Sequence, residues 1–173
     1  AHIQNSFGVM PFAEVASISQ DPVDPLPATH SGAWLNQLSE DVIETILEYA
    51  TPQGGPCPLT LTEVRHVGGA MTSLDGDENA FGLRDCPLLL DIVAFTGSSE
   101  IHTTVKEHIR QFKAALGDHL ADGAYMNFLD GEEARQDTAK AFGADKFERL
   151  TAIKSKYDPK NLFRYGYAIS PKN

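Results

Sequence analysis

The stretch PLLLDIVAF, residues 87–95, is apolar at nearly every position, and Asp91 is its one charged residue. A half-buried strand would alternate apolar and polar residues, so this run predicts a central strand that is covered on both faces. Periodicity alone also allows a buried helix, but the short length and the β-branched pair Ile92–Val93 favour a strand. A carboxylate in such a strand must be paired or neutralised. We expect Asp91 to lie at a strand end or to meet a partner such as Arg84, a structural role in preference to a functional one.

A long amphipathic helix is expected directly after this strand. Apolar residues recur there at intervals of three or four positions, which places them on one face of a helix. Ser98 or Ser99 can cap the first turn. The apolar stripe consists of Ile101, Val105, Ile109, Phe112, Leu116 and Leu120.

The segment after the long helix begins with another strand candidate, Tyr125–Leu129. Asp130, followed three residues later by Glu133, resembles a capping box and predicts the start of a helix that ends near Gly143. A last helix follows and cannot continue through Pro159, because the proline ring clashes with the preceding turn. The apolar stripe of that last helix is Phe147, Leu150, Ile153 and Tyr157.

Two further strands and one helix are expected upstream of residue 87. The runs His30–Leu35 and Leu59–Arg65 are strand candidates. In the first, alternation would place Ser31, Ala33 and Leu35 on one face and His30, Gly32 and Trp34 on the other. Between the two strands, Ser39 can cap a helix, and the apolar stripe of this helix is Val42, Ile43, Ile46, Leu47 and Ala50.

This order of elements predicts an α+β fold. About four strands and four helices follow one another without strict alternation and with short connections, which favours an antiparallel β-sheet with helices packed on one face. The 173 residues are enough for one domain. A doubly wound nucleotide-binding sheet is less favoured, because no strand leads into a G-x-G-x-x-G turn.

Composition excludes several classes of partner. The net charge is −10, and nucleic acid or an anionic membrane surface would require clustered Lys and Arg. No run approaches the ~20 apolar residues of a membrane-spanning helix. The acidic loop with Asp75, Asp77 and Glu78 lacks the full set of spaced oxygen ligands for calcium, so no metal is expected. Cys57 and Cys86 do not form a disulfide framework, and a cytoplasmic location is the default expectation.

Three segments together resemble the berberine-bridge-enzyme-like, FAD-linked oxidoreductases. One is YMNFLDGEEARQDTAKAFGADKFERLTAIKSKYDPKNLFRYGYAISP, residues 125–171. Another is HVGGAMTSLDGDENAFGLRDCPLLLDIV, residues 66–93, in which a Gly-Gly-Ala strand, a loop, an Ala-Phe pair, an Arg and an apolar strand follow in order. Ser31–Ile43 resembles a strand and a capped helix that the family places earlier. The agreement in order covers nearly the whole chain.

The resemblance implies a single substrate-binding domain over residues 1–173, shaped as an antiparallel sheet that covers a flavin. The family binds FAD mainly with a separate N-terminal domain, which we expect to be absent here and to be the partner of this chain. The implied reaction is hydride transfer from a small organic substrate to the flavin. This chain alone is expected to be inactive, with an exposed apolar surface that favours self-association. The alternative is a non-catalytic binding or assembly module with the same fold.

The resemblance also implies a set of site residues. In many members a Tyr in a Y-x-N-Y motif is the catalytic base, and here the motif is Tyr125-Met126-Asn127-Phe128. Phe128 stands where the family has this Tyr and cannot accept a proton, so the catalytic base is unknown. Tyr125 and Asn127 are the candidates for contact with the cofactor, although Tyr125 and Phe128 could instead only fill the core. The candidates for substrate binding are Phe128, Arg84 and Trp34.

Overall fold

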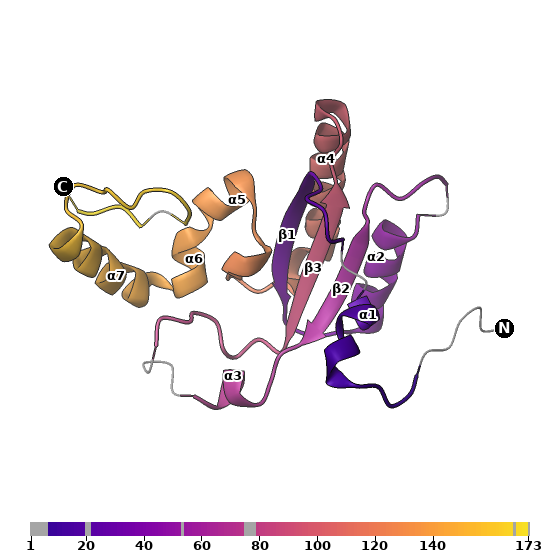
Figure 1. Ribbon diagram of the computed structural model, residues 1–173, viewed down its shortest axis with the longest axis horizontal. Helices are drawn as coiled ribbons and strands as arrows, with labels where there is room; N and C mark the ends of the chain where they lie inside the picture. Colours follow the sequence, from indigo (N-terminus) through magenta and orange to yellow (C-terminus); the bar gives the residue numbers. More distant parts are fainter. Residues whose placement is uncertain (1–6, 20–21, 53, 75–78, 168, 173) are drawn as a thin grey trace.

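A three-stranded antiparallel sheet lies at the centre of the computed structural model, which describes residues 7–19, 22–52, 54–74, 79–167 and 169–172 (Figure 1). Its strands are β1 (Ala28–Leu35), β2 (Leu61–His66) and β3 (Leu88–Phe95), in the order β1-β3-β2. The apolar stretch that predicted a central strand is therefore β3, which pairs with both other strands. The α+β class with an antiparallel sheet is confirmed.

Two helices cover one face of the sheet. They are α2 (Glu40–Ala50) and α4 (Ser99–Leu116), which pack against each other and against the strands (Figure 1). Alternate residues of β1 and β3 point into this layer and meet the apolar stripes of both helices. The resulting core consists of Leu35, Val42, Leu90, Ile92, Ala94, Val105, Ile109, Phe112 and Leu116.

Both helices begin where the sequence predicted, but their stripes are wider than their buried faces. The Ser98 hydroxyl caps α4 by accepting a hydrogen bond from the backbone N–H of Ile101, whereas Ser39 precedes α2 and makes no such bond. Ile43 and Leu47 are exposed on α2, because only one side of this helix faces α4 and the sheet. The predicted stripe was wrong at these positions. Leu120 lies beyond the end of α4, where it forms an isolated bridge with Leu35.

The segment Tyr125–Leu129 does not form the predicted fourth strand. Met126–Phe128 is instead a short 3-10 helix, η3, which crosses the face of the sheet opposite α2 and α4 beside β1. The outer edge of β1 is met by the preceding segment, in which the backbone N–H of Ala121 donates to the carbonyl oxygen of Trp34 at 2.9 Å. Because this edge is already occupied by residues 120–121, the chain leaves it and folds over the sheet.

Three helices continue beyond η3 on the β1 side of the sheet (Figure 1). They are α5 (Gly131–Gln136), α6 (Thr138–Phe142) and α7 (Ala144–Tyr157), so the single helix predicted from Asp130 to Gly143 is interrupted at Asp137. Of these helices, α7 lies farthest from the sheet, beyond α6 (Figure 1). Asp130 caps α5 through its own side chain. Glu133 does not complete the predicted capping box, because its carboxylate accepts a 2.7 Å hydrogen bond from the Ser31 hydroxyl and pairs with Lys113 at 3.1 Å.

The remaining elements are short. They are η1 (Phe12–Glu14), α1 (Ala16–Ser19), α3 (Ala70–Ser73) and η2 (Gly117–His119). The acidic loop residues Asp75, Asp77 and Glu78, where no metal was expected, lie outside the described residues. None of the helices in the described part of the chain is long and apolar enough to span a membrane.

Replacing Leu90 with Ala should destabilise the fold strongly. Leu90 is fully buried between the sheet and the two helices, and truncating such a side chain leaves a cavity that costs about 2–5 kcal/mol. Urea unfolding followed by circular dichroism measures this loss. Leu47→Ala, at a position that is 54% exposed, is the matched control and should change the free energy of unfolding by no more than about 0.5 kcal/mol. Equal effects for the two substitutions would contradict the assigned core.

Candidate functional site

The sheet face opposite α2 and α4 carries a mixed aromatic and charged surface. Strand alternation directs Asp91 of β3 away from the helices, since its neighbours Leu90 and Ile92 belong to the helix-side core. The same alternation places Glu63 and Arg65 of β2 and His30 of β1 on this face. The face is therefore charged in the middle, whereas the face beneath the helices is mainly apolar and carries the hydroxyl residues Ser31 and Thr62.

Aromatic side chains from three separate segments meet at one end of this face. The ring of Tyr125 lies 5.8 Å from Trp34, 6.3 Å from Phe81 and 5.0 Å from Phe128, in each case edge to face. Such arrangements are favourable because the positive edge of one ring meets the negative face of the next. Trp34 is 1% exposed and Phe128 is 8% exposed. We call these four packed side chains, Trp34, Phe81, Tyr125 and Phe128, the aromatic wall.

Phe128 can lie against the sheet because Gly32 has no side chain. A Cβ atom added to Gly32 would stand 2.6 Å from the Cβ of Phe128, closer than real side chains approach. Gly32 is paired with Asp91 across the β1–β3 ladder. The missing side chain at Gly32 therefore lets the Cβ of Phe128 lie over β1 at the position that pairs with Asp91, while Phe128 packs in the cluster with Trp34 and Leu89.

Asp91 is buried in mid-strand and is not paired as the sequence predicted. It is 5% exposed, and its Oδ1 has no hydrogen-bond partner among the described residues. Burial raises the pKa of Asp91 above its ordinary value, against the opposing effect of His30 and Arg65. The expected partner, Arg84, instead donates a hydrogen bond to the side chain of Asn79 at 2.6 Å. The prediction of a strand-end position or an Arg84 partner was wrong.

Arg65 is one of two arginines that lie over rings of the aromatic wall, the other being Arg84 over Phe81. The guanidinium carbon of Arg65 lies 4.8 Å from the centre of the Phe128 ring, a cation–π contact. Its Nε and Nη2 also donate to the two carboxylate oxygens of Glu63 at 2.7 and 3.0 Å. Neither Glu63 nor Arg65 was predicted as a site residue, although their i, i+2 spacing in a predicted strand placed them on one face.

The five residues predicted for the site lie in one region of the structure. Asn127 donates a 3.0 Å hydrogen bond to the Tyr125 hydroxyl, and both residues line a pocket of ≈ 170 Å³ together with Trp34. Phe128 borders the Tyr125 ring on the side of Arg65. Arg84 is the most distant member and lies over the outer ring, Phe81, at 5.0 Å. Their roles in binding stay predictions.

The pocket is small compared with the cofactor that the resemblance implied. Its ≈ 170 Å³ is below the ~300–1,000 Å³ of sites that enclose a drug-sized ligand, and FAD is larger still. The pocket therefore does not fit whole FAD, and the residues around it could contact only an edge of a ligand that is held elsewhere. Within the described ranges, no three His, Cys, Asp or Glu side chains are grouped to hold a metal ion.

Comparison with known proteins identifies relatives of this fold and surface. Residues 124–170 match the family described as berberine and berberine like. The chain is 28% identical to an FAD-linked oxidoreductase of Bacillus subtilis, over 93% of this chain and 35% of that protein. It is 25% identical to the glucooligosaccharide oxidase of Sarocladium strictum, over 78% of this chain and 30% of the oxidase.

A solved structure supports the same relationship at the level of fold. The BBE-like 1 protein of Physcomitrella patens superimposes with a TM-score of 0.74 at 20% identity, over 91% of this chain and 33% of that one. The chain thus spans about a third of the length of the proteins that it matches. It is related to the berberine-bridge-enzyme-like, FAD-linked oxidoreductases, and the resemblance predicted from the sequence is confirmed.

Replacing Asp91 with Asn should change how stability depends on pH. Because the folded-state pKa of Asp91 is raised by burial, the folded protein binds more protons than the unfolded chain between the ordinary Asp value and the raised one. In that window the Asp91 contribution to stability falls as pH rises. Urea unfolding at several pH values should show that Asp91→Asn removes this fall and is relatively more stabilising at pH 7 than at pH 4.

The control for this experiment is Asp85→Asn, which changes an exposed carboxylate in the loop before β3. The difference between Asp85→Asn and the unsubstituted protein should stay nearly constant over the same pH range. If Asp91→Asn behaves in the same way, Asp91 does not carry a raised pKa.

Proposed function

We propose that this chain is the substrate-binding domain of an FAD-dependent oxidoreductase, in which hydride passes from a small organic substrate to the flavin. The observation that carries the proposal is that the berberine-like segment contributes two rings, Tyr125 and Phe128, to the aromatic wall. Tyr125, Asn127 and Phe128 fall within the matched residues 124–170, and Phe128 is seated over Gly32 beside the position of the buried Asp91. An aromatic surface next to a carboxylate with one unpartnered oxygen, Oδ1 of Asp91, can hold an organic molecule and accept a hydrogen bond from it.

The chain's own residues would position the substrate and manage its proton. Tyr125 and Phe128 would bound the reacting region and keep water away from it. Asp91 would accept the proton of a substrate hydroxyl, a role that Phe128 cannot fill. A carboxylate whose pKa is raised by burial is a stronger base than an ordinary one. FAD would supply the hydride acceptor.

The partner of this chain would be the FAD-binding domain of the same longer protein. The chain spans about a third of its relatives, and the pocket lined by Tyr125 and Asn127 is far too small for the whole cofactor. We therefore propose that residues 1–173 form one domain, that FAD is bound mainly outside it, and that this chain alone is inactive. Tyr125 and Asn127 would then contact the flavin from the substrate side, with Arg84 and Trp34 supporting the substrate pocket.

The proposal is tested with the longer FAD-containing protein, by mixing it anaerobically with a panel of alcohols and following the loss of flavin absorbance. Asp91→Asn should slow this reduction by about 10²-fold or more, which is the usual contribution of a general base. Phe128→Tyr should speed the reduction of the flavin by alcohols, because it restores a phenol beside Asp91. Phe128→Leu, which keeps an apolar group there, is the matched control and should not speed it.

The opposite results are informative. Unchanged rates for both Asp91→Asn and Phe128→Tyr would place the reaction away from this face. A longer protein that binds FAD, but in which no substrate of the panel reduces the flavin, would support the second candidate, a non-catalytic binding or assembly module. The observation in favour of that candidate is the identity of residue 128. Phe128 stands where many family members have the Tyr that acts as the catalytic base, and a Phe side chain cannot accept a proton.

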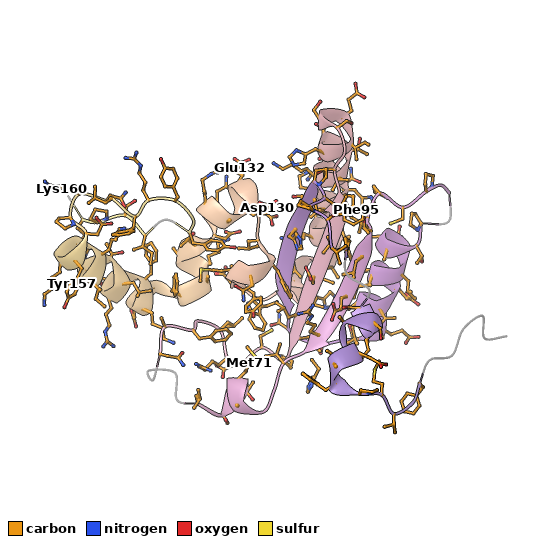
Figure 2. The ribbon with its side chains drawn as sticks, viewed as in Figure 1. Met71, Phe95, Asp130, Glu132, Tyr157 and Lys160 are labelled. Atoms are coloured by element: carbon orange, nitrogen blue, oxygen red, sulfur yellow. The ribbon has the colours of Figure 1, made fainter. Side chains whose placement is uncertain are left out.

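The isolated chain should self-associate through its exposed apolar residues. Phe12, Phe163 and Tyr165 are 87%, 84% and 89% exposed, and Tyr157 is also exposed on the outer surface of α7 (Figure 2). Apolar surface of this extent favours association, and in the longer protein the FAD-binding domain would cover part of it. Sedimentation velocity over a range of concentrations should show species larger than a monomer.

The substitution that tests this surface is Phe163→Ser combined with Tyr165→Ser, which should shift the distribution towards monomer. Arg149→Gln, on the exposed side of α7, is the control and should leave it unchanged. A monomer at every concentration for the unsubstituted chain would contradict the expectation.

A further inference from the structure

Two carboxylates stand directly opposite each other on the open sheet face. Glu63 of β2 is paired with Asp91 of β3 in the antiparallel ladder, and partners in such a ladder direct their side chains to the same face. Like charges in this position repel and favour protonation of one of the two groups. The negative charge of Glu63 therefore opposes the ionisation of Asp91.

Arg65 is placed to relieve this repulsion. Its two-point ion pair with Glu63, at 2.7 and 3.0 Å, neutralises the carboxylate opposite Asp91. The fork geometry fixes the orientation of the Glu63 side chain as well as its charge. Asp91 does not share this ion pair, and its Oδ1 is left without a partner among the described residues.

A second contact fixes Arg65 over the same spot. The guanidinium group lies 4.8 Å from the centre of the Phe128 ring, and Phe128 is held against Gly32. Arg65 therefore touches both the residue opposite Asp91 and the aromatic residue seated beside it. An ordinary surface ion pair would lack the second contact.

We infer that Arg65 is a positioning residue for Asp91, which binds Glu63 and Phe128 at once and so keeps Asp91 available as the proton acceptor of the site. The catalytic consequence rests on the proposed function, whereas the electrostatic arrangement does not.

The charged groups around Asp91 are few and their effects have known signs. Burial raises its pKa, His30 on β1 and Arg65 on β2 lower it, and Glu63 raises it. The hydrogen bonds to Glu63 raise the pKa of Arg65, so its guanidinium stays charged. The helices α2 and α4 pack on the other face of the sheet.

The experiment is an NMR titration of the Asp91 carboxyl carbon in the purified chain, with Arg65→Gln, Glu63→Gln and the double variant. Arg65→Gln removes a positive charge and frees Glu63, so the midpoint of Asp91 should move up. Glu63→Gln removes the opposing negative charge and leaves Arg65 unpaired, so the midpoint should move down. The double variant should lie between the two, and Arg65→Lys should restore part of the Arg65→Gln shift.

Two shifts of opposite sign, each larger than the fitting error, support the inference. Shifts of the same sign, or none, overturn it. Arg149→Gln, on α7, removes a positive charge elsewhere and should leave the midpoint unchanged. If Arg65→Gln disturbs the packing of Phe128 enough to unfold the chain, Glu63→Gln still tests the inference, because it removes no contact with that ring.

A pH profile of kcat/KM in the longer FAD-containing protein separates this inference from the proposed function. The acid limb should move to higher pH in Arg65→Gln and to lower pH in Glu63→Gln, following the NMR midpoints, because the base must be deprotonated to act. NMR shifts without a matching change in the acid limb would leave the Arg65 arrangement standing and remove Asp91 as the base. A merely structural Arg65 would lower the rate equally at all pH values.

Discussion

The burial of β3 on both faces is the constraint on which the rest of the structure depends. On one face α2 and α4 supply apolar side chains, and the cost of ordering the chain is offset by a continuous core. On the other face no long helix is present in the described part of the chain, and η3 with its neighbours takes that place. This cover is possible only because Gly32 lets Phe128 approach the sheet. The candidate site lies on the face covered by η3, because this cover tolerates a charged residue of β3, Asp91.

Much of the fold could be predicted from the sequence because its signals are local. The uninterrupted apolar run of β3 and the buried part of the α4 stripe, Val105 to Leu116, each follow from spacing alone, whereas Ile101 of the predicted stripe is exposed. The strand predicted at Tyr125–Leu129 failed for a non-local reason, since the edge of β1 was already occupied by Leu120 and Ala121. Exposure of Ile43 likewise depends on where α2 meets α4, which no helical period can specify.

The candidate site was predictable in part, for the same physical reason. The resemblance of the Tyr125–Phe128 motif brought its residues together correctly, because neighbours in sequence stay neighbours in space. For Asp91 the sequence predicted Arg84 as the partner, which is wrong, and Arg65 was not among the predicted site residues. Which strand lies beside which is set by the sheet order β1-β3-β2. A cross-strand pair such as Glu63 with Asp91 can be found only when that order and its register are known.

The contact between Ser31 and Glu133 joins a strand of the sheet to the C-terminal helices. Glu133 on α5 accepts a hydrogen bond from Ser31 of β1 and pairs with Lys113 of α4, so one carboxylate fastens the C-terminal helices to both layers of the domain. Ser31 adjoins Gly32, the residue under Phe128. The segment that carries Tyr125 and Phe128 is thus held at two points, by the contact of Phe128 with Gly32 and by the bonds of Glu133 to Ser31 and Lys113. A displacement of the C-terminal helices would reach the aromatic wall through Ser31, the residue next to Gly32.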